Sequence, residues 1–100
     1  MDLERRILRG KVLLGQGRRD EAEQVLEQTL AELCFPLDAD MIVDARYTQF
    51  WVIWIQGRYA ETGPVAEALA ELAGRQGRDD QLFSAKVCLA YHHVAVGDLA

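Results

Sequence analysis

Several features that mark large classes of protein are scarce or missing in this chain of 100 residues. Its two cysteines, Cys34 and Cys88, lack the paired spacing of a zinc site, so we expect both to be buried, reduced thiols. The most apolar run, residues 41–55, is interrupted by Asp44 and Arg46 and is shorter than the roughly 20 residues of a membrane span. The first residues form no apolar signal segment. We therefore expect a cytoplasmic protein without a membrane partner.

The chain also lacks an excess of positive charge. Its 11 lysine and arginine residues are outnumbered by 16 aspartate and glutamate residues, which gives a net charge of −5. Nucleic-acid binding requires a basic surface that neutralises phosphates. Basic residues do gather between Arg5 and Arg19, but Glu4 precedes this group and Asp20 and Glu21 follow it directly. We therefore expect no direct binding of nucleic acid.

No arrangement of residues typical of an enzyme or of a cofactor site is present. Gly15-Gln16-Gly17 follows a helical pattern and lacks the lysine-serine sequel of a phosphate-binding loop. Cys88 and His92 are four residues apart, but no second pair completes a metal site and no third group orients them for catalysis. The pair Asp79-Asp80 fits a helix cap better than a catalytic carboxylate pair. The sequence thus predicts no enzyme activity, no catalytic residues, no cofactor and no bound metal.

Apolar residues are spaced as in helices throughout the chain, and no strand-like alternation occurs, which predicts an all-α fold. The expected helices are residues 2–16, a second that follows the Gly15–Gly17 turn and ends before Pro36, residues 41–56, residues 58–73 and residues 79–96, with residues 97–100 as the start of a sixth. Gly63-Pro64 predicts a late start or a kink in the fourth, because proline removes a backbone donor. We expect Asp38 or Asp40 to cap the third helix, and Asp79 or Asp80 the fifth.

The third expected helix is apolar on nearly all sides. Helices of this kind are normally surrounded by other helices. We therefore expect it to be the core of the domain. Its apolar residues are Ile42, Val43, Tyr47, Phe50, Trp51, Val52, Ile53, Trp54 and Ile55.

Three glycines define an internal period. Gly17, Gly57 and Gly97 lie forty residues apart, and each closes a helical stretch. Glycine often ends a helix in the left-handed conformation, and a period of this size indicates stacked helical hairpins. The pattern predicts one domain of three units, about residues 2–36, 38–76 and 79–100. Because the last unit lacks a second helix, we expect the chain to be a piece of a longer protein.

These units resemble tetratricopeptide (TPR) repeats, in which two antiparallel helices are joined by a tight turn. Residues that match in type and spacing are Gly10, Leu13, Gly17, Ala22 and Leu26, and similar turns begin at Gly57 and Gly97. The chain departs from the family where Arg6 replaces an aromatic residue, Phe50 a small one, and Thr29 and Thr62 alanine. Its interval also exceeds the roughly 34 residues of standard repeats. Longer, degenerate units are similar to those in large bacterial signalling and transcriptional regulators.

The resemblance implies a TPR-like α-solenoid whose first helices line a groove for a peptide or partner domain. The groove positions carried over are Ile7 and Lys11 in the first unit, Asp44, Tyr47, Trp51 and Trp54 in the second, and Ser84, Val87 and Tyr91 in the third. Tyr47, Trp51 and Trp54 share one side of the third expected helix, and we call them the aromatic stripe. Aromatic side chains dominate binding hot spots. The same stripe also fits a buried core, and this alternative stays open.

From these features we expect a protein-interaction scaffold within a signalling or transcriptional regulator. The alternative is a structural or oligomerisation bundle without a peptide groove, and exposure of Tyr47, Trp51 and Tyr91 would distinguish the two. A regulatory segment of an enzyme whose catalytic part lies elsewhere also fits the sequence. Because no polar capping helix is present, we expect the fifth helix to leave part of its Val87–Val94 side, including Leu89, uncovered and to self-associate through it.

Overall fold

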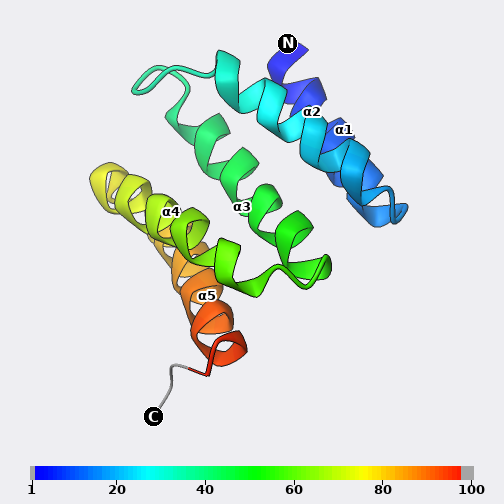
Figure 1. Cartoon of the computed structure of the whole chain (residues 1–100). Coiled ribbons are helices and arrows are strands. Elements are labelled where there is room, and N and C mark those ends of the chain that lie inside the picture. Colours follow the sequence, from blue (N-terminus) through cyan, green and yellow to red (C-terminus); the bar gives the residue numbers. More distant parts are fainter. Residues whose placement is uncertain (1, 98–100) are drawn as a thin grey trace.

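The computed structural model describes residues 2–97, and within that range it contains five α-helices, one short 3₁₀-helix and no strand (Figure 1). These elements are α1 (Asp2–Gly15), α2 (Arg19–Glu32), α3 (Ala39–Ile55), η1 (Tyr59–Glu61), α4 (Thr62–Gln76) and α5 (Asp79–Ala95). The all-α class predicted from the sequence is confirmed. Of the expected turn and sixth helix at residues 97–100, Gly97 lies in a turn, and residues 98–100 fall outside the described part. None of the described helices is long and apolar enough to span a bilayer.

Each helix packs against the next, and α3 lies between the pair α1–α2 and the pair α4–α5 (Figure 1). It is in contact with all four other α-helices. This placement explains why its sequence is apolar on nearly all sides, since a helix with neighbours all round has little surface left for charged residues. The expectation that this helix is the core is therefore confirmed.

The buried side chains form two clusters that meet on α3. We call the first the N-terminal core cluster; its buried members, from α1, α2 and α3, are Ile7, Leu13, Ala22, Leu26, Ala45 and Val52. The second is the C-terminal core cluster; its buried members, from α3, α4 and α5, are Val43, Phe50, Ile53, Val65, Ala66, Leu69, Ala73, Ala85 and Cys88. The two sides of α3 therefore hold one helix pair each.

The turns after α1 and α3 have the same backbone geometry. Gly17 and Gly57 adopt φ values of 76° and 75°, in the left-handed region that glycine favours. After each glycine, the next N–H reaches back five residues, from Arg18 to the carbonyl of Leu13 (2.9 Å) and from Arg58 to that of Ile53 (3.4 Å). These are the bonds of a Schellman motif, which satisfies the last carbonyls of a helix.

The helices α3 and α5 are related by the same interval as the turn glycines. Both contain 17 residues. Their first residues, 39 and 79, and their last residues, 55 and 95, are each forty positions apart. Gly97, which follows α5, again adopts a positive φ of 71°. The interval seen in the sequence therefore also relates the bounds of these two helices.

The fourth helix starts late, as Gly63-Pro64 predicts. Residues Tyr59–Glu61 form the 3₁₀-helix η1, and α4 begins at Thr62, with Pro64 in its first turn. The expected end at residue 73 is too early. The helix continues to Gln76 and is closed by Gly77, whose φ of 65° makes it the C-terminal cap.

The capping predictions are only partly correct. Asp38 does occupy the N-cap position of α3, but its carboxylate accepts the N–H of Cys34 (3.0 Å) and caps no helical N–H. Asp40 lies inside the first turn, because α3 begins two residues earlier than expected. For α5 the prediction is wrong: the N-cap residue is Arg78, and Asp79 and Asp80 both belong to the first turn.

The two cysteines differ in environment, which corrects the expectation that both are buried. Cys34 is exposed because it follows the end of α2, in the segment that leads to α3. Cys88 is fully buried on α5. Burial raises the pKa of the Cys88 thiol to about 12, since a thiolate loses its hydration there.

Candidate partner-binding surface

The groove residues predicted on three helices line adjoining hollows on one side of the molecule. We call this surface the α1–α3–α5 face; its residues are Lys11, Asp44, Tyr47, Trp51, Trp54, Ser84 and Tyr91. One hollow, between α1 and α3, is lined by Lys11, Asp44, Tyr47 and Trp51. A second, between α3 and α5, is lined by Asp44, Tyr47 and Ser84. Trp54 and Tyr91 line a third. Asp44 and Tyr47 line both of the first two hollows, and the contact between the rings of Trp51 and Tyr91 connects these hollows to the third.

At the α1 side of this face, Lys11 and Asp44 form an ion pair. The Lys11 Nζ lies 2.7 Å from Asp44 Oδ1, and both side chains are nearly half exposed. Such an exposed pair contributes little to stability, because water solvates both partners well. The two charges are therefore accessible to polar groups of a binding partner, and the apolar surfaces of Leu14, Tyr47 and Trp51 lie beside them.

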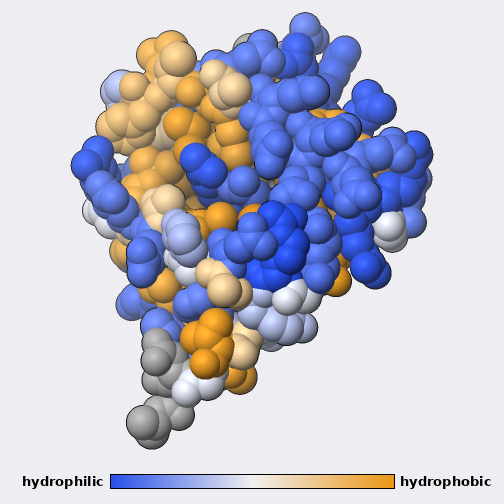
Figure 2. Space-filling model, in the orientation of Figure 1, coloured by the Kyte–Doolittle hydropathy of each residue, from blue (hydrophilic) through white to orange (hydrophobic). Residues whose placement is uncertain are grey.

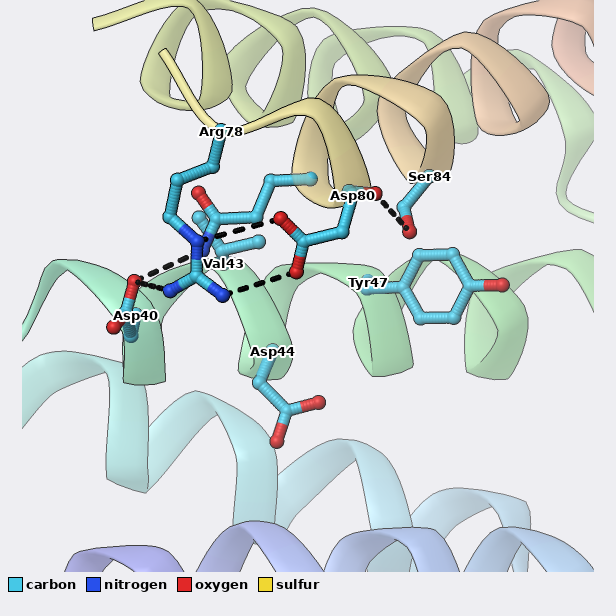
Figure 3. A pocket seen from close by; sticks show the side chains of 8 residues that line it. Asp40, Val43, Asp44, Tyr47, Arg78, Asp80 and Ser84 are labelled. Atoms are coloured by element: carbon cyan, nitrogen blue, oxygen red, sulfur yellow. Dashed lines mark hydrogen bonds and ion pairs between the residues drawn. The ribbon is translucent and has the colours of Figure 1, made fainter. Parts of the chain in front are cut away.

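A polar cluster fills the hollow where α5 begins. Figure 3 shows the guanidinium of Arg78 between the carboxylates of Asp40 and Asp80, at 2.9 Å and 3.0 Å. Gln76 and Gln81 each donate a further hydrogen bond of 2.9 Å to Asp40 Oδ1. The bond from Gln76, followed by the one from Gln81, lowers the pKa of Asp40. These charges are largely satisfied by one another, so the cluster fixes the start of α5 against α3.

The third part of the face is aromatic. The ring of Tyr91 meets those of Trp51 and Trp54 edge-on, with centroids 5.1 Å and 5.3 Å away. Edge-to-face pairs of this kind are favourable because the ring edge is positive and the ring face is negative. Tyr91 remains 47% exposed, and Val94 beside it 64%. Together with Ala90, these residues line an apolar hollow.

The aromatic stripe belongs to both the core and the surface. Trp51 packs on the fully buried Phe50, with ring centroids 4.9 Å apart, and Tyr47 and Trp54 also pack against the C-terminal core cluster. The side chains of Tyr47, Trp51 and Trp54 are half-buried, whereas Tyr91 is exposed. Neither of the two alternatives left open by the sequence therefore describes the stripe completely.

Two further groove positions suggested by the resemblance, Ile7 and Val87, are less exposed to solvent than Lys11 or Tyr91. Ile7 is buried in the N-terminal core cluster, so a role for its side chain in contacting a partner is wrong. Lys11, one helical turn further along α1, is exposed. Val87 is half-buried on α5, between these two extremes.

Two polar arrangements in the structure were not predicted from the sequence. One is the Arg78 cluster, because Asp79-Asp80 was interpreted as a helix cap. The other holds α5 to the start of α4: His92 Nδ1 lies 2.9 Å from the Thr62 hydroxyl and 3.1 Å from the Tyr59 carbonyl. In residues 2–97, no group of three or more histidine, cysteine, aspartate or glutamate side chains is arranged to hold a metal ion.

Comparisons of this chain with protein-family models, with curated proteins and with solved structures found no match. No activity or partner can therefore be carried over from a relative. The functional interpretation depends instead on the exposed side chains of the α1–α3–α5 face and on the packing of its three helices.

Proposed function

We propose that this chain is a TPR-like stack of helical hairpins that binds a peptide or a partner domain along its α1–α3–α5 face. Three observations support the stacked arrangement. The helix α3 packs on both α1 and α5, the turns at Gly17 and Gly57 share one geometry, and α5 has the length of α3 at an interval of forty residues. Stacked units of this kind build extended surfaces from corresponding helices.

The observation that carries the proposal is the exposed aromatic edge beside an accessible charge pair. Tyr91 and Val94 leave apolar surface open to water next to Trp54, and Lys11 and Asp44 lie at the other end of the same face. Large aromatic side chains lose little conformational entropy on binding, which makes them effective anchors. The face suits an extended segment with an apolar side chain at one end and polar groups at the other.

A protein partner suits this surface better than a nucleic acid. The chain carries a net charge of −5, and along the face the carboxylates of Asp40, Asp44 and Asp80 outnumber the paired cations of Lys11 and Arg78. Phosphate groups would be repelled there. Following the resemblance, we place such a segment in the cytoplasm, within a signalling or transcriptional regulator, as a scaffold and not as an enzyme. The rival role is a closed bundle without a groove. Tyr91 is exposed and disfavours it, whereas Tyr47 and Trp51 are half-buried and fit either role.

The two tryptophans of the chain offer a direct test, because both lie on the proposed face. Peptides selected from a displayed random library on the 100-residue protein would be titrated while tryptophan fluorescence is recorded. Binding should change the fluorescence emission of Trp51 and Trp54. The substitution Tyr91→Ala should lower the affinity for the peptides about tenfold or more, as for an aromatic hot spot.

The matched control is Leu37→Ala, a large apolar residue that is 90% exposed in the segment between α2 and α3. This variant should bind the selected peptides as the parent does, and circular dichroism should show that both variants are folded. If the peptides bind Tyr91→Ala and Leu37→Ala with equal affinity, or leave the tryptophan emission unchanged, the proposed face is wrong.

A further inference from the structure

The outer side of α5 leaves large apolar side chains uncovered. Phe83 is 69% exposed and Val94 is 64% exposed. Figure 2 shows hydrophobic surface at the C-terminal end of α5. The residues forty positions earlier, Val43 and Trp54 on α3, pack within the C-terminal core cluster against α4 and α5. Positions at which α3 packs against the following helix pair are therefore exposed on α5.

The opposite end of the molecule shows the complementary pattern on α1. Leu8 is 60% exposed and Val12 is 50% exposed. Forty positions later, Thr48 and Val52 on α3 are buried, and Val52 belongs to the N-terminal core cluster with α1 and α2. Positions at which α3 packs against the preceding helix pair are therefore exposed on α1.

The inner side of α5 shows the same correspondence at forty residues between α3 and α5. Ala85 and Cys88 are the counterparts of Ala45 and Thr48 at forty residues, and all four are buried. The helix α5 thus faces its preceding pair with the positions that α3 uses for the same purpose. Its uncovered residues are those that the next helix pair would cover.

We propose that two copies of this chain associate end to end, with Phe83 and Val94 on α5 of one copy packed against Leu8 and Val12 on α1 of the other. The contact would continue between copies the packing that joins α1 to α3 and α3 to α5 within one copy. Such an interface joins two different surfaces and leaves one of each kind free, so it adds further copies instead of stopping at two.

Charge favours this pairing of ends over a contact between two copies of α5. The helix α1 contains four basic residues and two acidic ones, a net of +2. The helix α5, which supplies the other surface, contains two acidic residues and one basic one apart from its histidines, a net of −1. Opposite charges steer the α1 end of one copy toward the α5 end of another, whereas two α5 ends repel.

The association can be measured on the 100-residue protein by sedimentation equilibrium over a range of concentrations. The average mass should rise past twice the 11.3 kDa of one chain, and added salt should weaken the association. Two variants isolate the two surfaces: Leu8→Gln with Val12→Gln on α1, and Phe83→Gln with Val94→Gln on α5. All four residues are at least half exposed, and glutamine is a good helix former, so the variants should remain folded.

Each variant alone should associate at least about tenfold more weakly than the parent protein, because each has lost one of the two surfaces. An equimolar mixture retains one intact surface of each kind and should form a 1:1 complex that grows no further. Leu37→Gln, which removes an exposed apolar side chain outside both surfaces, should associate as the parent does. Circular dichroism spectra establish that all variants are folded.

Two results would overturn the proposal. If the parent protein stays monomeric up to about millimolar concentration, a range in which even weak contacts are populated, the bare ends serve another partner or further helices of a longer chain. If the α1 variant still forms dimers by itself, two α5 surfaces meet each other, and the end-to-end arrangement is wrong.

Discussion

Replacing Gly57 by alanine tests the turn geometry on which the arrangement of hairpins depends. Gly57 has a φ of 75°, and an added Cβ would meet no atom within 4 Å. The substitution therefore changes the backbone preference without creating a clash. A left-handed conformation costs a residue with a side chain roughly 1–2 kcal/mol, and the lower entropy of the unfolded alanine chain offsets part of that. We expect a net loss of about 1 kcal/mol in the free energy of unfolding.

Gly74 supplies the matched control. It lies within α4 without a positive φ, and an added Cβ there also meets no atom within 4 Å. Alanine should stabilise this position by about 0.5–1 kcal/mol, since glycine is a poor helix former. The two glycine-to-alanine substitutions thus have opposite signs and differ by roughly 2 kcal/mol. At about 4–8 °C per kcal/mol for a domain of this size, their Tm values should differ by about 8–16 °C.

Thermal and urea unfolding, followed by circular dichroism at one protein concentration, would measure both effects. Gly17→Ala should behave like Gly57→Ala, because Gly17 has a φ of 76° and equally open surroundings. The reasoning fails if Gly57→Ala is as stable as the parent protein or shifts in the same direction as Gly74→Ala. It also fails if Gly17 and Gly57 differ widely, since their turns would then not be equivalent.

Two further predictions concern charge and burial. Arg58→Met should lower the free energy of unfolding in urea by about 1–2 kcal/mol, because Arg58 bonds both Glu61 and the distant Glu23 on α2. Arg18→Met should lower it by under about 0.5 kcal/mol, since Arg18 pairs only with the exposed Glu21 one turn away. Equal losses in the two variants would contradict this prediction. Iodoacetamide should label Cys34 in the folded protein and Cys88 only on unfolding. Because burial raises the pKa of Cys88 from 9.0 to about 12, stability should decline above about pH 9, where only the unfolded thiol ionises.

The helices and turns were predictable because their signals are local. Apolar spacing places the helices, and glycine or proline ends them within a few residues of the expected positions. Gly63-Pro64 predicted a late start for α4, and Gly17 and Gly57 predicted left-handed turns. These features depend on the conformational preferences of single residues, which the amino-acid sequence states directly.

Burial and polar pairing were less predictable because they depend on distant segments. Ile7 and Lys11 occupy the same side of α1, and only the position of the other helices decides that Ile7 is covered. Similarly, Arg78 lies 38 positions after Asp40, so their ion pair of 2.9 Å has no local signature. Cys34 was expected to be buried because an isolated cysteine without metal spacing is usually a buried thiol, and no local signal shows that the segment after α2 leaves it exposed.

The aromatic stripe shows why a partner and the core would be coupled at this face. Trp51 contacts the fully buried Phe50 on one side and the half-exposed Tyr91 on the other. Truncating Trp51 would therefore loosen the packing of α3 on α5 and remove partner contact area at the same time. Tyr91 contributes mainly exposed surface, so its truncation separates loss of binding from loss of stability. A peptide bound there would also stabilise the α3–α5 contact, because a ligand that binds only the folded state raises the free energy of unfolding.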